Sequence, residues 1–225
     1  MPPVSPACRK SIVRGGSEGK ETGARNACAR RHELLQTQAR GIGEVQQEAQ
    51  PLRGRLAPAV GPLQAVGDDP DELARIYARV LNQALEGKPA DLTVGLHVCR
   101  GNFRSTWISE GGYEPVAEVL FGGVNVDAFF LVYDNDRSGD FAPLRFIRPG
   151  HQQVVLGLIT TKNGELENPE GIKARLEEAA KYVAKEQICL SPQCGFASTE
   201  EGNSLSESQQ WDKVRLVTQI ASEVW

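Results

Sequence analysis

His97 and Cys99 stand two positions apart in the segment LHVCRGNFRSTW, at the end of an apolar run. On a β-strand, side chains two positions apart project to the same side, so an imidazole and a thiolate could reach one metal ion. Cys194 follows a second apolar run, in LSPQCGF. One histidine and two cysteines suit zinc, and three protein ligands leave a fourth position for a substrate. The spacing alone leaves an alternative open, because a strand histidine is often a core residue and a free cysteine a small hydrophobe.

The other histidines and cysteines give weaker signals. Cys8 and Cys28 lie in a weakly patterned segment, Cys189 lies within an expected strand, and His151 lies in a loop. Five scattered cysteines do not form the pattern of a disulfide framework. The apolar runs are too short to span a membrane, and the start of the chain lacks a secretory pattern. The sequence therefore predicts a cytoplasmic protein with reduced thiols and no membrane partner.

From residue 68 onward, the apolar spacing alternates between helical and strand periodicity. Asp69 is expected to cap a first helix, with Pro70 at its first position and Glu72 completing a capping box. Asn168 and Ser206 are expected to cap two later helices. The predicted strands cover residues 92–99, 125–134, 153–160 and 187–191, and a short predicted helix covers residues 113–121. This order predicts an α/β fold with a parallel sheet, either an open sheet or part of a (β/α)8 barrel.

The two parts of the chain differ in charge. Residues 1–65 hold ten Lys/Arg and five Asp/Glu, residues 66–225 hold fifteen and twenty-four, and the whole chain carries −4. Residues 1–67 are rich in Arg, Gly, Ala, Pro and Gln, which predicts a weakly ordered leader with at most a short helix over residues 31–39. This leader has no aromatic residue to stack on a base and no nucleic-acid-binding motif, so nucleic acid is not an expected partner.

Several segments after residue 68 resemble the C-terminal part of the cobalamin-independent methionine synthase family. They are DPDELARIYARVLNQAL, LHVCRGNFRSTWISEGGYEPVAEVLF, DAFFLVYDNDRSGDFAPLRF, VVLGLITTK and QICLSPQCGFASTEEGN. The resemblance covers residues 68–225 and implies about four βα units of a (β/α)8 TIM barrel with a catalytic zinc ion. It also implies that His97, Cys99 and Cys194 are zinc ligands. The implied reaction is methyl transfer from 5-methyltetrahydropteroyl-polyglutamate to homocysteine, which forms methionine.

Two features depart from the family pattern. Val132 stands in FFLVYD, where the family has FFLEYD with a glutamate that is a further zinc ligand. Asp134 lies two residues on and faces the same side, so it could substitute, although an aspartate in YDND is equally a strand-ending turn residue. The leader does not resemble the family, so we expect a truncated or mis-started chain without the first barrel strands and much of the substrate site. The exposed sheet edges of such a chain would favour self-association.

Four polar residues follow the strand that carries the predicted metal ligands. Arg100, Asn102, Arg104 and Ser105 could bind the carboxylates of a folate tail, or they could bind loop carbonyls and neighbouring acids. Trp107 could stack on a pterin, but packing within the loop is the favoured interpretation.

Three functions remain open at this point. The first is the zinc-dependent methyl transfer of methionine synthesis. The second is another zinc-dependent thiol alkyl transfer of the same family, such as the reaction that adds an epoxide-derived group to coenzyme M. The third is a fragment that binds zinc without catalysis, which the Val132 substitution and the missing strands favour.

Overall fold

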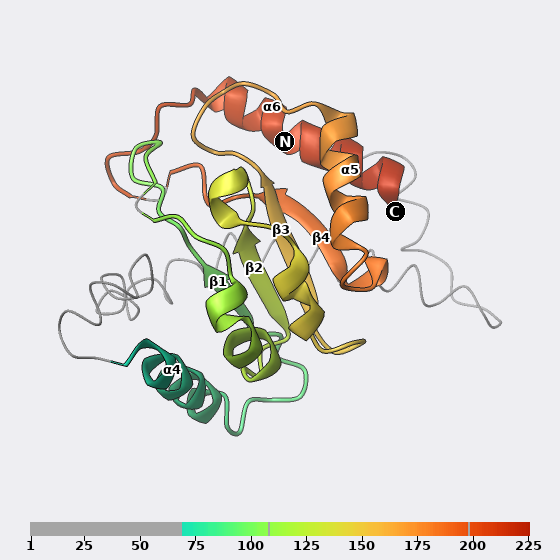
Figure 1. The fold of residues 1–225 in the computed structure, drawn as a ribbon. Coiled ribbons are helices and arrows are strands. Elements are labelled where there is room, and N and C mark those ends of the chain that lie inside the picture. Colours follow the sequence, from blue (N-terminus) through green and yellow to red (C-terminus); the bar gives the residue numbers. More distant parts are fainter. Residues whose placement is uncertain (1–68, 108, 198) are drawn as a thin grey trace. The chain divides into compact units, whose positions relative to one another are not determined.

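Four parallel strands form the central sheet, and they lie side by side in chain order (Figure 1). The strands are β1 (Gly95–Val98), β2 (Ala128–Val132), β3 (Gln153–Ile159) and β4 (Ile188–Pro192). This computed structural model describes residues 69–225 except 108 and 198, so the predicted leader at 1–67 lies outside the described residues. Parallel neighbours require crossover connections, and the predicted parallel α/β fold is therefore confirmed.

Among the described residues, three α-helices flank the strands in the sequence, and each begins at a capping residue that the sequence predicts. They are α4 (Pro70–Ala84), α5 (Pro169–Ala179) and α6 (Glu207–Val224). The Asp69 and Asn168 side chains accept hydrogen bonds from the first backbone N–H groups of α4 and α5. Ser206 forms a capping box at the start of α6. In α4, the Glu72 N–H donates to the Asp69 side chain at 3.5 Å, and the Glu72 carboxylate lies 3.5 Å from the guanidinium of Arg75. No helix in the described part of the chain is long and apolar enough to cross a bilayer.

The segment predicted as a short helix over residues 113–121 is not a regular α-helix. It consists of a 3₁₀ helix, Glu114–Val116, followed by a π-helical turn, Glu118–Gly122. The backbone is tight where this turn ends, since a Cβ at Gly123 would lie 2.3 Å from the carbonyl oxygen of Val119. Strands β1 and β2 are also shorter than predicted, and Cys99 lies just beyond the end of β1.

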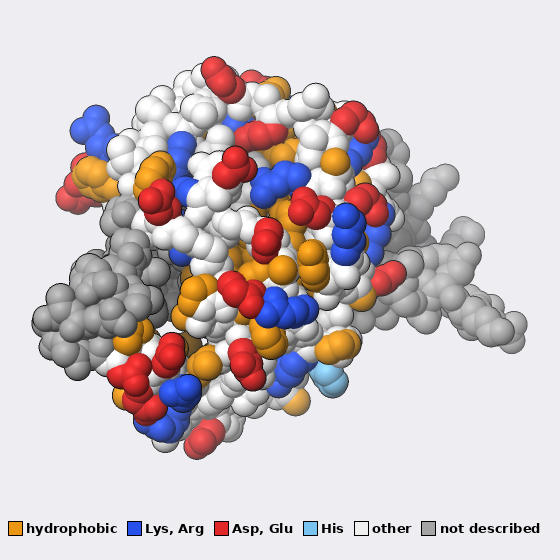
Figure 2. Space-filling model, in the orientation of Figure 1, with side chains coloured by type: hydrophobic (Ala, Val, Ile, Leu, Met, Phe, Trp, Pro, Cys, Tyr) orange, Lys and Arg blue, Asp and Glu red, His pale blue; other side chains and the backbone are white. Residues whose placement is uncertain are grey.

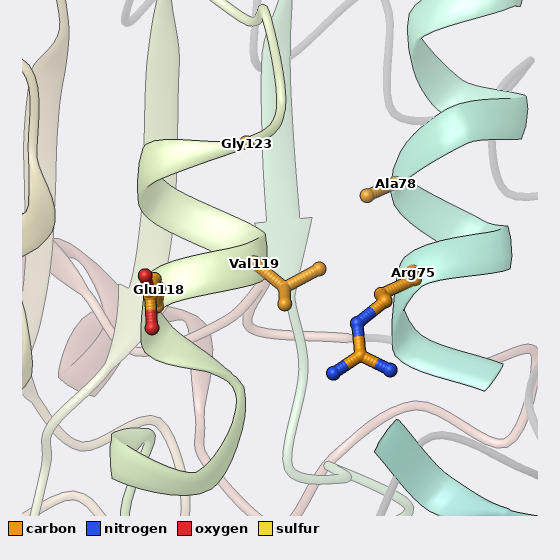
Figure 3. A pocket seen from close by; sticks show the side chains of 5 residues that line it. All are labelled: Arg75, Ala78, Glu118, Val119 and Gly123. Atoms are coloured by element: carbon orange, nitrogen blue, oxygen red, sulfur yellow. The ribbon is translucent and has the colours of Figure 1, made fainter. Parts of the chain in front are cut away.

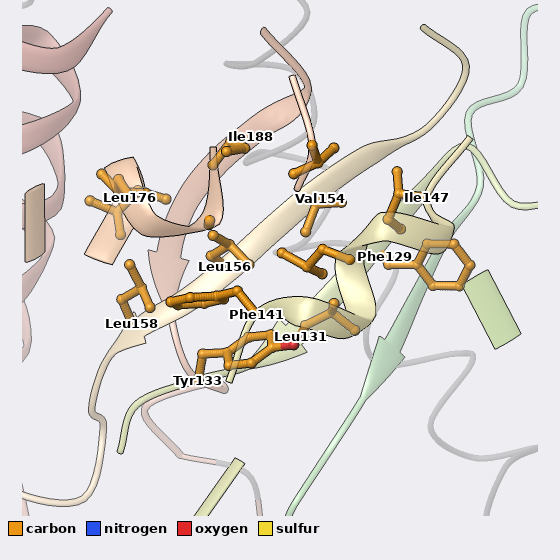
Figure 4. Packing of buried hydrophobic residues seen from close by; sticks show 14 of the residues in the cluster. Phe129, Leu131, Tyr133, Phe141, Ile147, Val154, Leu156, Leu158, Leu176 and Ile188 are labelled. Carbon is orange, nitrogen blue, oxygen red and sulfur yellow. The ribbon is translucent and has the colours of Figure 1, made fainter. Parts of the chain in front are cut away.

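The hydrophobic core fills the space between one face of the sheet and the helical segments (Figure 4). Side chains alternate along a strand, so β2 turns Phe129 and Leu131 toward this core, and Tyr133 follows them just past its end. Leu176 of α5 and Phe141 of the β2–β3 connection pack against the same face. Acidic and basic side chains are interspersed on the face seen in Figure 2.

The opposite face of the sheet carries the residues with possible chemistry. Ala128, Phe130 and Val132 of β2 alternate with the core residues and do not belong to the main core cluster. His97 is the register partner of Phe130, so the two side chains share this face. Within the described residues, β1 and β4 are the two sheet edges, each paired on one side only.

Candidate metal centre

The chain after β4 folds back over the end of β3 and thereby carries Cys194 toward β1. The backbone N–H of Gln193 donates to the carbonyl oxygen of Ile159 at 2.8 Å. Gly157 makes this path possible, because a Cβ there would lie only 2.7 Å from the Cα atom of Gln193. Cys194 leaves β4 at one edge of the sheet, and its thiol reaches the end of β1 at the other edge.

His97, Cys99 and Cys194 meet at this point. The two cysteine Sγ atoms lie 3.5 Å apart, and the Sγ atom of Cys194 lies 3.6 Å from Nε2 of His97. One ligand atom from each residue lies within 4.8 Å of the other two. The structure thus brings Cys194 beside His97 and Cys99, which lie almost a hundred positions earlier in the sequence. His97 and Cys99 are exposed, so a further ligand has access to the cluster.

Two of the three separations match the edges of a tetrahedral zinc site, and the third, between His97 and Cys99, lies within 4.8 Å. With zinc–sulfur bonds of about 2.3 Å and zinc–nitrogen bonds of about 2.0 Å, a tetrahedron separates two sulfurs by about 3.8 Å and a sulfur and a nitrogen by about 3.5 Å. The observed separations of 3.5 and 3.6 Å agree with these edges to within a few tenths of an ångström. Two thiolates and one imidazole are also the donor types that zinc prefers.

The imidazole of His97 is oriented by the neighbouring strand. Its Nδ1 atom lies 3.2 Å from the carbonyl oxygen of Phe130, and a carbonyl can only accept a hydrogen bond. Nδ1 therefore carries the proton, and Nε2 presents its lone pair toward Cys194. This is the tautomer that a metal ion requires.

The two thiols share one environment and influence each other's ionisation. A hydrogen bond from Cys194, with smaller contributions from His97 and the backbone N–H of Gly101, lowers the pKa of Cys99 to about 4, and desolvation opposes this shift. The same contact with Cys99, together with burial, raises the pKa of Cys194 well above its ordinary value. The Gly101 N–H donates to Sγ of Cys99 at 3.2 Å. The first thiolate is therefore held at Cys99 even without a metal.

The four polar residues after β1 occupy different positions. Asn102 is buried, and its Nδ2 atom donates to Oγ1 of Thr161 at 3.0 Å and to the carbonyl oxygen of Gly195 at 2.9 Å. The hydroxyl of Ser105 donates to the side chain of Asn203. These contacts fasten the loop after β1 to the loops after β3 and β4.

Arg100 and Arg104 differ in exposure. Arg100 is buried, with its guanidinium 4.3 Å from the centroid of the Tyr113 ring, whereas Arg104 is exposed in a turn with a φ of 44°. Trp107 is 46% exposed, and the guanidinium of Arg137 lies 5.4 Å from its ring. Part of the Trp107 ring therefore remains accessible to solvent in this loop.

Val132 lies two residues beyond the register partner of His97 on the same face, but its side chain offers no ligand atom. The Tyr113 hydroxyl accepts from the backbone N–H of Val132 at 2.9 Å and donates to its carbonyl oxygen at 3.2 Å. Strand β1 ends at Val98, opposite Leu131, so the Tyr113 hydroxyl takes the hydrogen bonds of the next β2 residue, Val132, in place of a strand. Burial raises the pKa of Tyr113 to about 12, although nearby Arg100 opposes the shift, so the hydroxyl remains a donor at neutral pH.

Asp134 is not brought into the cluster. Its side chain is fully buried, and Nη2 of Arg137 donates to one carboxylate oxygen at 2.9 Å. The Thr160 hydroxyl donates to the other oxygen at 3.0 Å, and Nζ of Lys162 lies 3.9 Å away. These three partners engage both oxygens of the carboxylate that the sequence offers as a substitute ligand.

A hollow of about 390 Å³ lies elsewhere, between α4 and the π-helical turn (Figure 3). It is lined by Arg75, Ala78, Glu118, Val119 and Gly123, and Figure 3 shows Val119 and Arg75 pointing into the gap. None of the cluster residues lines this pocket.

The fold and the cluster together define a parallel α/β protein with a site suited to one zinc ion. No protein-family model matches the chain. The chain is 56% and 58% identical over 163 residues to the uncharacterized proteins YxjG and YxjH of Bacillus subtilis, which covers 72% of this chain and 43% of each relative. It is 25% identical over 116 residues to the methionine synthase of Sulfurisphaera tokodaii, which covers 52% of this chain and 30% of that protein. The chain thus spans less than half the length of these relatives.

Two solved structures extend the comparison. The first is the "Putative Vitamin-B12 Independent Methionine Synthase" of Listeria monocytogenes, with 42% identity, a TM-score of 0.57, and coverage of 76% of this chain and 45% of that one. The second, a B12-independent methionine synthase of a Shewanella species, shares the fold at 24% identity with a TM-score of 0.54, over 68% of this chain and 44% of that one. The chain is therefore methionine synthase-like in sequence and fold.

Proposed function

We propose that this chain is the zinc-binding part of a cobalamin-independent methionine synthase, with four βα units of its (β/α)8 barrel. The observation that carries the proposal is the convergence of His97, Cys99 and Cys194 within 4.8 Å at the strand ends. The similarity to proteins named methionine synthase supports a methyltransferase, and methyl transfer to a thiol is the proposed reaction. The proposed acceptor is homocysteine, and the proposed donor is 5-methyltetrahydropteroyl-polyglutamate.

The three side chains have distinct roles in this proposal. His97 presents Nε2 because Phe130 holds the proton on Nδ1. Cys99 and Cys194 supply two negative charges that would balance a divalent cation. When bound, zinc lowers the pKa of a coordinated thiol, so that the acceptor is a thiolate nucleophile at neutral pH. Val132 adds no donor, which leaves the exposed side of the cluster to the acceptor thiol.

The same chemistry bears on the compartment. Cys99 and Cys194 form no disulfide, and a site built on two thiols needs a reducing environment. We therefore place the protein in the cytoplasm.

A direct assay tests the proposal. The full chain is loaded with one equivalent of zinc and incubated with homocysteine and methyltetrahydrofolate carrying a labelled methyl group. Labelled methionine is the expected product, and Cys194→Ser should abolish it. Turnover that is unchanged in Cys194→Ser would exclude this cluster as the active site.

A second candidate function rests on Val132. Without an anionic side chain at this position, the cluster could hold zinc and fail to activate a thiol. This reading of the chain as a non-catalytic zinc protein predicts one bound zinc and no labelled methionine. An assay with coenzyme M as acceptor and an epoxide as donor, in place of homocysteine and methyltetrahydrofolate, tests the remaining alkyl transfer.

A further inference from the structure

Gln193, a buried residue just after β4, links the loop after β3 to the metal cluster. Its Nε2 atom donates to Sγ of Cys194 at 2.8 Å. Its Oε1 atom accepts from Nζ of Lys162 at 2.9 Å and from Oγ1 of Thr161 at 2.9 Å. Gln193 is only 2% exposed, so these contacts are shielded from competing water.

Lys162 fixes which end of the Gln193 amide faces the sulfur. An ammonium group has donors but no acceptor, so it can only approach the amide oxygen. Turning the amide over would place two donors against Nζ, which is repulsive, and once a metal holds Cys194 as a thiolate it would also place the amide oxygen against that negative charge. The amide nitrogen must therefore face Cys194.

A chain of hydrogen bonds reinforces the same orientation. Nδ2 of Asn102 donates to the Thr161 hydroxyl at 3.0 Å, which leaves that hydroxyl free to donate to Gln193. Lys162 is itself held in place, since its side chain is 9% exposed and its Nζ lies 3.9 Å from the buried carboxylate of Asp134. The hydrogen bonds thus run in one direction, from Asn102 through Thr161 and Gln193 to the sulfur of Cys194.

We infer that Lys162 and Gln193 form a relay that holds the Cys194 sulfur in its metal-binding orientation, with Lys162 as a positioning residue that acts through Gln193. The inference rests on the proposed function, because it assigns these residues to the same site. His97 is placed by β1 and Cys99 follows it directly, with its sulfur held by the Gly101 N–H, whereas Cys194 lies two residues beyond β4 and needs a support of its own. The relay supplies that support from a third loop.

The test is a double-mutant cycle on zinc affinity, measured by competition with a chromophoric chelator. Gln193→Leu should weaken zinc binding about 10- to 100-fold, as the loss of a partner to a metal ligand usually does. Lys162→Met should weaken it in the wild-type background and have no effect in the Gln193→Leu background. An equal change in both backgrounds would mean that Lys162 acts on the ion directly, and it would overturn the relay. Lys185→Met, which removes a surface lysine paired with Glu177, is the matched control.

A second measurement does not require a metal. In the metal-free chain, the side-chain amide signal of Gln193 in a nitrogen–proton NMR spectrum should shift in Lys162→Met and in Cys194→Ser, but not in Lys185→Met. An unmoved signal would overturn the relay even if zinc does not bind. Zinc binding without methyl transfer would contradict the proposed function alone. Gln193→Met, which keeps the length and removes the donor, replaces Gln193→Leu if that variant does not fold.

Discussion

Replacing Val132 with glutamate should convert a three-ligand zinc site into a four-ligand site. Val132 is fully buried and lies on the same sheet face as His97, two residues past its register partner. A glutamate at this position would place a carboxylate beside the two thiols. Without a metal, the buried carboxylate has no cation within the cluster to pair with, which is unfavourable.

The expected magnitude follows from these opposing effects. Zinc sites with four protein ligands bind with about 10–16 kcal/mol, or about 3 kcal/mol for each ligand. Displacing a water molecule and desolvating the carboxylate reduce this gain by about 1–2 kcal/mol. The net gain of about 1–2 kcal/mol corresponds to zinc binding that is tighter by roughly 10-fold or somewhat more.

Competition with a chromophoric chelator measures the affinity, and thermal unfolding with and without zinc measures the linked stability. Val132→Glu should bind zinc more tightly than wild type, and its metal-free form should melt at a lower temperature. Val132→Gln is the matched control, since it has the same shape without the charge. Equal zinc affinity in Val132→Glu and Val132→Gln would refute the placement of Val132 beside the cluster.

Three further predictions concern pH, stability and association. In the metal-free chain, Cys99 should react with iodoacetamide above about pH 4 and lose this reactivity as the pH falls through its lowered pKa. Cys194, whose pKa is raised, should stay protonated and unreactive at pH 7. Equal labelling of both cysteines in peptide mass analysis would contradict the assignment. Lys213 is fully buried and donates to Glu167 at 3.0 Å, so Lys213→Met should lower the free energy of unfolding, measured in urea, by about 3 kcal/mol. The control is Arg215→Met, which removes an exposed ion pair, and an equally small loss of stability in both variants would count against this prediction. The single-sided edges β1 and β4 should make the chain self-associate with rising concentration, and a monomer at all concentrations in size-exclusion chromatography would argue against it.

The sequence predicted the order of strands and helices because each is marked by local chemistry. Asp69, Asn168 and Ser206 cap their helices through side-chain oxygens, a signal that depends only on neighbouring residues. The segment around Glu114–Gly122 was predicted less well. Its apolar spacing is helical, but the backbone forms a 3₁₀ helix and then widens to a π-helical turn, a difference that the apolar spacing does not report.

The metal centre was predicted only in part for the same reason. His97 lies on β1 and Cys99 follows its end two positions later, so their spacing along the extended chain predicts that their side chains lie on the same side. Cys194 reaches them because Gly157 allows the chain after β4 to cross the end of β3, which is a tertiary contact without a local signal. Gln193 and Lys162 were not predicted, although both follow strands that end at the same rim of the sheet.

The most direct test of the central claim is the zinc content of the purified full chain. We predict one zinc per chain in wild type, held by His97, Cys99 and Cys194. Cys194→Ser should lose most of this zinc after dialysis against a weak chelator, and Cys189→Ser, which lies outside the cluster, should retain it. Zinc retained equally by Cys194→Ser and wild type would contradict the assignment of this cluster as the metal site.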